Sequence, residues 1–256
     1  MAKLTDTDIH NICQRARSET IFPDGRTANE FGVVAAGGKL TRHWVLNAYV
    51  HGIFPWPLDL EDGTQEKVLG WFCPNPRTVL MPADLHIPRR LGRKIRSGRF
   101  RVSSDQSFAT VISECSGPRI VAGKLETGTW ITSEMKSVYA ELHEMGIAHS
   151  IEVWQDDTLV GGLYGVAVGS IFCGESMFRH VSDASRVALC VLIQHLRAWG
   201  FALLDVQQAT PHCTALGAVD IPRARYLQIL ETGLDDPAVF GVVGGLDIAK
   251  YPTRLT

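Results

Sequence analysis

The amino-acid sequence predicts an α+β protein built around a mixed sheet. Three observations support this prediction: helical periodicity over 133–146 and 182–200, β-prone runs between and after these segments, and an aromatic, proline-rich region before residue 80. Of the 256 residues, 45% are hydrophobic and 20% are charged, which allows a sizeable core and excludes wholesale disorder. A chain of this length forms one large domain or two small ones.

The first 75 or so residues are rich in aromatic and turn residues, which predicts a region of strands and turns. Prolines at 55, 57, 74 and 76 forbid a long helix in segments such as HGIFPWP and LGWFCPNPRTVLMP. Taken singly, aromatic residues such as Trp56 are more often core residues than ligand platforms. An aromatic ring beside prolines can also present a flat face on which a nucleobase stacks. We make no structural prediction for 1–30 or 236–256.

A basic segment follows at 86–101, HIPRRLGRKIRSGRFR, with seven Lys or Arg residues and no acid. Helical spacing places Arg89, Arg93 and Arg96 on one face and turns Leu91 and Ile95 elsewhere. Guanidinium groups bind phosphate oxygens in pairs, so this face suits a polyanion. A solvated helix face is an equally good reading.

The second half alternates helices and strands. SEMKSVYAELHEMG predicts an amphipathic helix capped by Ser133 and stopped by Gly146, and 149–178 predicts a hairpin that turns at 155–157. The glycines at 161, 162, 165 and 169 indicate bulges or a close backbone approach. A helix over 182–200, a short strand in FALLDVQQ and a helix beginning near Pro222 complete the pattern. We expect the site at strand ends.

One acid is out of place in this pattern. The stretch GSIFCGESMFRH puts Glu175 among glycine, aromatic and sulfur-containing residues. Because burying an unpaired carboxylate is costly, such an acid usually has a partner or a function. The structural alternative is an acid favoured by the dipole of the helix that begins near Ala184.

Cysteine spacing and hydropathy exclude several classes of protein. The six cysteines lie far apart without a C-x-x-C pair, so we expect reduced, mostly buried thiols and neither a zinc site nor a disulfide scaffold. No apolar run approaches the roughly 18–20 residues of a membrane helix, and the N-terminus lacks the apolar core of a signal peptide. We therefore expect a cytoplasmic protein without a membrane partner.

Nine short motifs occur in the order and spacing seen in the leucyl/phenylalanyl-tRNA protein transferases, and the chain resembles this family over roughly 31–230. The motifs are GIFPW, W-x-C-P-N-P-R, TGTWIT, AHSIEVW, LVGGLYGVAVG, F-C-GESMF, ASR-x-AL, LLDVQ and H-C-T-A-L-G-A…I-P-R. The resemblance implies a small N-terminal domain (1–80) and an acetyltransferase-like (GNAT) catalytic domain (81–256). It also implies an aminoacyltransferase that moves Leu or Phe, and less well Met, from aminoacyl-tRNA to an N-terminal Arg or Lys, creating an N-end rule degradation signal.

The resemblance assigns a role to particular residues. Leu-tRNA and Phe-tRNA are then the co-substrates, with no metal, diffusible cofactor or DNA. Trp56 and Trp130 match the aromatic residues that hold the terminal adenosine, and the basic face matches a cationic patch for the tRNA acceptor stem. The residues that match the side-chain pocket are Leu163, Phe172, Leu189 and Leu196. Leu163 and Leu196 stand where some relatives carry Met and Phe, so the preference among Leu, Phe and Met stays open. Two loops, around 58–67 and 117–126, are longer than in the family.

The same resemblance makes Asp205 and Gln207 of LLDVQ the candidate catalytic pair. Strand alternation puts both side chains on one face, where Asp205 polarises or orients Gln207 and the Gln207 carbonyl oxygen accepts a hydrogen bond from the attacking amine. The ester is already activated, so positioning supplies most of the rate enhancement. Glu175 then anchors an ammonium group, either that of the esterified amino acid or that of the incoming N-terminus.

Two rival functions remain at this stage. A CoA-dependent N-acetyltransferase would share the fold, but the stretch FRHVSDASRVAL has no glycine for a pyrophosphate turn. A noncatalytic RNA-binding module explains the arginines and tryptophans, but it gives no reason for Asp205, Gln207 and an apolar pocket together.

Overall fold

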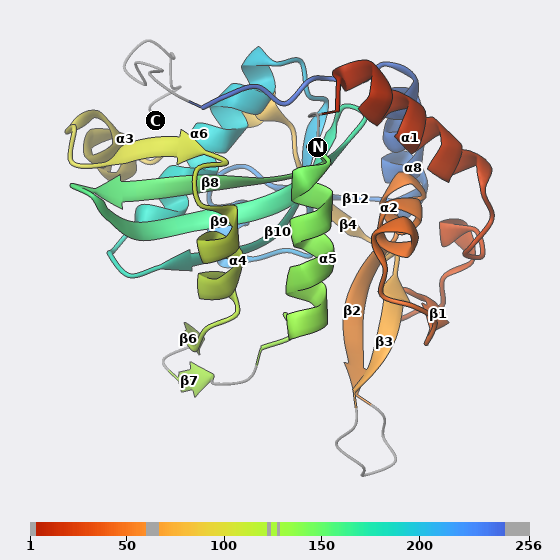
Figure 1. Cartoon of the computed structure of the whole chain (residues 1–256). Coiled ribbons are helices and arrows are strands. Elements are labelled where there is room, and N and C mark those ends of the chain that lie inside the picture. The colour runs from red at the N-terminus through yellow and green to blue at the C-terminus, as the bar shows by residue number, and fades with distance from the viewer. Residues whose placement is uncertain (1–3, 60–66, 122–123, 127–128, 244–256) are drawn as a thin grey trace.

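A seven-stranded mixed sheet dominates the computed structural model, which describes residues 4–59, 67–121, 124–126 and 129–243 (Figure 1). Its strand order is β12-β4-β11-β10-β9-β8-β5. β10 and β11 pair in parallel and the other neighbours are antiparallel, which confirms the predicted α+β class with a mixed sheet. The strands are β4 (Arg77–Leu80), β5 (Arg101–Ser104), β8 (Ala148–Gln155), β9 (Thr158–Val168), β10 (Ile171–Arg179), β11 (Leu203–Gln207) and β12 (Val219–Ile221).

Helices cover both faces of this sheet. On one face lie α4 (Phe108–Cys115) and α5 (Ser133–Glu144), and on the other lie α3 (Arg89–Arg96) and α6 (Ala184–Ala198) (Figure 1). Each face has its own apolar cluster, one around Tyr139 and Tyr164 and the other around Phe172 and the leucines of α6. The sheet is therefore buried on both sides, which explains the long apolar runs of its central strands.

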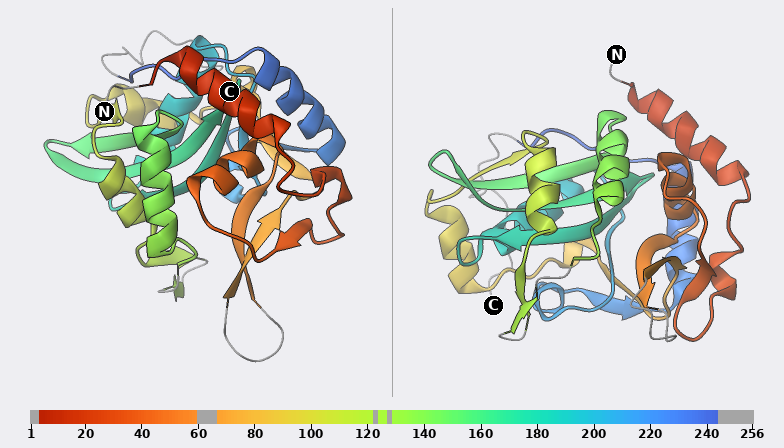
Figure 2. Two further views of the ribbon diagram at one scale, coloured as in Figure 1. Left: turned by 45° about the vertical axis from the view of Figure 1, so that its right-hand side comes forward. Right: turned by 60° about the horizontal axis from the view of Figure 1, so that its bottom comes forward.

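A second, three-stranded sheet lies beside α1, α2 and α8 (Figure 2). It has the order β1-β3-β2, with β1 at Val33–Ala36, β2 at Phe54–Asp59 and β3 at Lys67–Phe72. The helices are α1 (Asp6–Ser18), α2 (Arg42–Val50) and α8 (Arg223–Asp235). The remaining elements are β6 (Arg119–Val121), β7 (Lys124–Glu126), α7 (Pro211–Thr214) and two 3₁₀ turns, Gly25–Thr27 and Pro82–Asp84.

The N-terminal region contains two helices: α2, which the prediction of strands and turns omitted, and α1, which lies in 1–30, where no prediction was made. A capping box between Thr5 and Asp8 starts α1, and the Thr41 side chain caps α2. The prolines at 55 and 57 lie in β2, an edge strand, where a missing N–H is tolerated. They restrict the chain only near themselves, and both helices precede them.

The segment 149–178 was predicted as a two-stranded hairpin, and this prediction was wrong in one respect: the chain turns twice and forms β8, β9 and β10. The second turn is at Gly169, whose φ is +58° and where an added Cβ would lie 2.3 Å from the carbonyl oxygen of Gly233. Gly169 therefore marks a turn rather than a bulge, and the predicted close approach of another backbone is confirmed there. The other predicted elements are present, with Thr132 instead of Ser133 capping α5.

Four further sequence predictions concern the domain boundary, two loops, the cysteines and membrane insertion. β4 begins at Arg77 and already belongs to the large sheet, while the division at residue 80 stays a prediction. The lengthened loops predicted around 58–67 and 117–126 lie partly outside the described residues. All six cysteines are free and buried, as predicted. Among the described residues, none of the helices has the length and hydropathy needed to cross a membrane.

Candidate active site

A cavity of about 120 Å³ lies where strands β10 and β11 end their pairing. Paired residues run from Ile171 and Leu203 to Cys173 and Asp205, and the residues that follow line the cavity. We call it the β10–β11 cavity. Its wall comes largely from β9, β10, β11 and α6. The principal lining residues are Leu163, Tyr164, Glu175, Met177, Leu189, Leu192, Leu204 and Gln207.

Glu175 lies on a β-bulge rather than at a strand end or a helix start. Gly174 pairs with Gly165 and Ser176 pairs with Tyr164, so Glu175 is the additional residue of β10. A bulge redirects a side chain relative to its neighbours, and here the carboxylate lines the cavity. The alternative role as a helix-dipole acid is therefore wrong, because Glu175 lies within β10 and α6 begins at Ala184.

Neutral hydrogen-bond donors surround the Glu175 carboxylate. The Tyr139 hydroxyl donates to its Oε2 at 3.0 Å, the Gln207 Nε2 donates to its Oε1 at 3.2 Å, and Tyr49 lies 2.6 Å from the Tyr139 hydroxyl. Burial raises the pKa of Glu175 from 4.5 to about 7, although the hydroxyls of Tyr49 and Tyr139 act in the opposite direction. At neutral pH this acid is poised between its two protonation states.

Gln207 has an unusual backbone conformation. Its φ is +62°, which is uncommon for a residue other than glycine, and a register shift separates it from Asp205. The Asp205 Oδ1 accepts a hydrogen bond from the Gln207 backbone N–H at 3.0 Å. Asp205 thus contacts the backbone of Gln207, while the Gln207 side chain contacts Glu175. The predicted shared face of the two side chains is interrupted by this irregularity.

A buried ion pair holds Asp205 in place. Arg77 binds both carboxylate oxygens, with Nε–Oδ1 at 2.8 Å and Nη2–Oδ2 at 2.6 Å, and the Tyr226 hydroxyl donates to Oδ2 at 2.8 Å. Both Arg77 and Asp205 are almost completely buried. Burial opposes the charge of Arg77, but the Asp205 carboxylate outweighs it and raises the pKa of the guanidinium well above its usual value. Asp205 is therefore already occupied by partners from β4 and α8.

The structure brings some of the predicted site residues together and separates others. Glu175, Asp205, Gln207, Leu163 and Leu189 all line the β10–β11 cavity. Phe172 and Leu196, also predicted for the side-chain pocket, are fully buried in the apolar cluster of α6 and are not among the lining residues. Sequence reasoning missed Arg77, Tyr139, Tyr164, Leu192 and Leu204, which look like ordinary strand or helix residues in the sequence.

The two tryptophans predicted to hold adenosine stack on each other. The rings of Trp56 in β2 and Trp130, just before α5, have centroids 4.7 Å apart and planes at 27°. Trp130 is buried, whereas Trp56 is 40% exposed. Since the rings are already in contact, a base would have to stack on the open side of Trp56.

The predicted basic face is on α3. Arg89, Arg93 and Arg96 are exposed, and Leu91 and Ile95 are buried beneath them, as the helical spacing predicted. Lys94 instead forms an ion pair with Asp183 at the N-terminus of α6. This contact ties α3 to the helix that forms one wall of the β10–β11 cavity.

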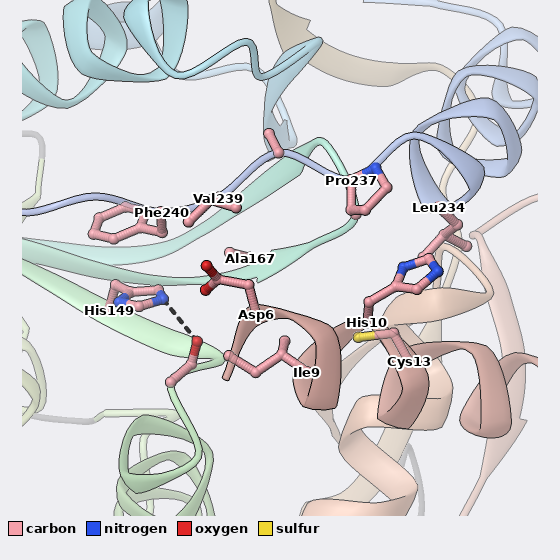
Figure 3. A pocket seen from close by; sticks show the side chains of 13 residues that line it. Asp6, Ile9, His10, Cys13, His149, Ala167, Leu234, Pro237, Val239 and Phe240 are labelled. Atoms are coloured by element: carbon pink, nitrogen blue, oxygen red, sulfur yellow. Dashed lines mark hydrogen bonds between the residues drawn. The ribbon is translucent and has the colours of Figure 1, made fainter. Parts of the chain in front are cut away.

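A second cavity, of about 90 Å³, lies near the C-terminal end of β9 (Figure 3). The residues that line it include Asp6, Ile9 and His10 of α1 and residues 237–240, which follow α8. His149 stacks on Phe240 with ring centroids 3.8 Å apart. This second cavity is lined by neither Glu175 nor Gln207, and it lies between N-terminal and C-terminal segments of the chain. We therefore regard the β10–β11 cavity as the better candidate site.

Metal binding has no support in the described part of the chain. There, no group of three or more His, Cys, Asp or Glu residues is arranged to hold a metal ion. The β10–β11 cavity itself presents carboxylate, amide and hydroxyl groups beside apolar side chains. This set can bind an ammonium group, orient an amine and enclose an apolar side chain.

Comparison with known proteins gives a consistent result. A family model described as leucyl/phenylalanyl-tRNA protein transferase matches 79–231, and one described as the N-terminal domain of that transferase matches 38–75. The leucyl/phenylalanyl-tRNA–protein transferase of Stutzerimonas stutzeri (strain A1501) is 48% identical over 224 residues, covering 87% of this chain and 95% of the relative. The proteins of the same name from Aromatoleum aromaticum and Anaeromyxobacter sp. (strain K) are 50% identical over 195 residues and 44% identical over 227 residues. The first covers 76% of this chain and 78% of the relative, and the second covers 89% and 94%.

Proposed function

The chain belongs to the leucyl/phenylalanyl-tRNA protein transferase family, and from this we propose that its β10–β11 cavity holds the amino acid of Leu-tRNA or Phe-tRNA for transfer to a protein. The observation that carries the proposal is the contact between Glu175 and Gln207 beside an apolar cavity. An apolar wall suits the side chain of Leu or Phe, and Met as a poorer donor. The acceptors are proteins that begin with Arg or Lys, and the product is an N-end rule degradation signal.

In this proposal Glu175 receives the ammonium group of the esterified amino acid. Its present partners, Tyr139 and Gln207, are neutral, so a cationic ligand would stabilise the ionised carboxylate. Tyr164 is a lining residue of the same cavity, and its hydroxyl is buried without a hydrogen-bond partner among the described residues. An unsatisfied buried hydroxyl is costly, and a polar group of the substrate would satisfy it.

Gln207 orients the attacking amine, and Asp205 supports Gln207. The α-amine lone pair forms the new C–N bond at the ester carbonyl carbon, the ester C–O bond breaks, and the terminal ribose hydroxyl leaves with the proton. A free α-amine has a pKa of ~7.7–8.0, so only modest help is needed to lose its proton. An amide oxygen from Gln207 accepts the N–H hydrogen bond that aligns the lone pair. Asp205 is a positioning residue, because its oxygens bind Arg77, Tyr226 and the Gln207 backbone.

Two further surfaces would bind the tRNA while its esterified amino acid occupies the cavity. The arginines of α3 bind acceptor-stem phosphates, and the terminal adenosine stacks on Trp56, which itself stacks on Trp130.

We further propose that transfer needs no metal or diffusible cofactor, since aminoacyl-tRNA is itself the activated donor. The acetyltransferase-like character of the large domain, its division at residue 80 and a cytoplasmic location stay predictions.

The first test is the transfer of labelled Leu from Leu-tRNA to two peptides that differ only in beginning with Arg or Ala, with acetyl-CoA as a parallel donor. We expect labelling of the Arg peptide from Leu-tRNA and none from acetyl-CoA. Labelling from acetyl-CoA alone would leave the fold standing and reject the function. Gln207→Ala should lower the turnover number, and wild-type turnover in this variant would remove the role given to Gln207.

A further inference from the structure

An open depression of about 250 Å³ lies beside the edge strand β12. Two exposed carboxylates, Glu30 and Asp220, line it together with Phe31, Asn75 and Gln208. Phe31 is 76% exposed, which is unusual for a ring of its size and leaves an apolar surface next to two acids. We call this feature the Asp220 depression. It combines negative charge with an apolar face, and neither the catalytic chemistry nor tRNA binding has used it.

The Asp220 depression and the β10–β11 cavity share one wall. Gln207 and Thr210 line the cavity, whereas Gln208 and Ala209, between them in the chain, line the depression. The segment 207–210 therefore separates the two, with Gln207 at its start. A molecule in the depression lies across this segment from one in the cavity.

The strand register places Asp220 at a definite distance from Gln207. Thr78 of β4 pairs with Gln207 on one side and with Asp220 on the other. Two strand spacings separate Asp220 from Gln207, which is about 9–10 Å. In Lys or Arg, six bonds of roughly 1.5 Å join the α-nitrogen to the terminal nitrogen or guanidinium carbon, an extended reach of about 7–8 Å. With a hydrogen bond at each end, such a residue spans from Gln207 to Asp220.

The charges around the depression favour a cation. The Thr78 hydroxyl donates to the Asp220 Oδ1 at 2.6 Å and so fixes that carboxylate. The backbone N–H of Arg223 donates to the Asn75 Oδ1 at 3.0 Å. The Arg223 guanidinium donates to the carbonyl oxygens of Gly25, Ala28 and Cys73. That cation is thus directed into a cage of carbonyl oxygens, none of which belongs to a residue lining the depression.

We propose that the Asp220 depression binds the cationic side chain of the acceptor protein's first residue. Asp220 and Glu30 pair with the guanidinium or ammonium group, and Phe31 packs against the methylene stem. The acceptor's α-amine then lies beside Gln207, facing the ester carbonyl. This inference rests on the proposed function, because it gives the acceptor rule a physical basis: a neutral side chain forms neither ion pair, and an acidic one is repelled.

The test uses charge reversal with the full-length chain. Leu transfer from Leu-tRNA is measured for peptides that begin with Arg, Lys, Ala or Glu, using the wild type, Glu30→Lys/Asp220→Lys and the milder Asp220→Asn. Glu144→Lys reverses an exposed carboxylate of α5 outside the depression and is the matched control. The KM for Leu-tRNA is measured in parallel, because intact donor binding shows that each variant is folded.

We expect the double reversal to raise the KM for the Arg peptide about tenfold or more, since two attractions become two repulsions. It should also improve transfer to the Glu peptide, while Asp220→Asn shows a smaller loss and Glu144→Lys shows none. An unchanged Arg-over-Ala preference in the double variant, with normal KM for Leu-tRNA, would overturn the assignment and leave the transferase function standing. If the wild type itself transferred Leu to none of the peptides, the proposed function would fail and this inference with it.

Discussion

The raised pKa of Glu175 makes a prediction about stability that can be worked out from the structure. Its folded-state pKa of about 7 exceeds the unfolded value of 4.5, so the folded protein holds this proton more tightly than the unfolded chain. Stability is then greatest below pH 4.5 and is lost as the pH rises towards 7. A shift of about 2.5 units corresponds to about 3 kcal/mol, which is fully lost above pH 7.

Glu175→Gln cannot ionise and keeps the shape of the side chain. We expect the variant to be more stable than the wild type by about 1 kcal/mol at pH 5 and by about 3 kcal/mol at pH 8. Urea unfolding followed by tryptophan fluorescence measures both values, and Glu144→Gln controls for the loss of an exposed α5 carboxylate. The same difference at pH 5 and pH 8 would refute the reasoning.

The same substitution should have the opposite effect on function. If Glu175 anchors an ammonium group, the wild-type KM for Leu-tRNA rises as the pH falls from 8 to 6, because protonation removes the anion. Glu175→Gln should raise this KM at pH 8 and abolish its pH dependence. A variant that gains stability and loses donor affinity would identify Glu175 as an acid kept for function at a cost in stability.

Three other predictions concern other parts of the site. Arg77→Met leaves the Asp205 carboxylate buried without its cation, so urea unfolding should show a loss of about 3–5 kcal/mol that Asp205→Leu partly restores; no restoration would contradict the ion-pair argument. Leu163→Ala enlarges the β10–β11 cavity, so the ratio of kcat/KM for Phe-tRNA over Leu-tRNA should rise, and an unchanged ratio would detach the cavity from selectivity. Arg93→Ala should reduce the slope of log Kd for tRNA against log salt by about 1, whereas an unchanged slope would mean a solvated helix face.

Periodicity predicted the large domain well because its elements follow simple rules. α5, α6 and α8 have apolar stripes and glycines near their ends, and all are present close to their predicted bounds. The turn at Gly169 was missed because a glycine in a β-prone run signals a bulge and a turn equally well. The sequence does not say which backbone approaches, and here it is that of Gly233, 64 residues later.

The candidate site was predicted as a set of residues but not as an arrangement. Motifs identified Glu175, Asp205 and Gln207, and all three line one cavity. Alternation then placed Asp205 and Gln207 on one face, whereas a positive φ at Gln207 breaks the alternation. Local patterns also do not reveal that Asp205 is held by Arg77, since Arg77 comes from β4, far from β11 in the sequence.

The two carboxylates at the site differ because their partners differ. Arg77, Tyr226 and the Gln207 backbone occupy the oxygens of Asp205, so a substrate group could bind them only by disrupting a buried ion pair. Glu175 has only neutral partners and an open cavity beside it. One acid is therefore suited to fixing the backbone that carries Gln207, and the other to meeting a charged ligand. The different surroundings of the two acids therefore account for the different roles proposed for them.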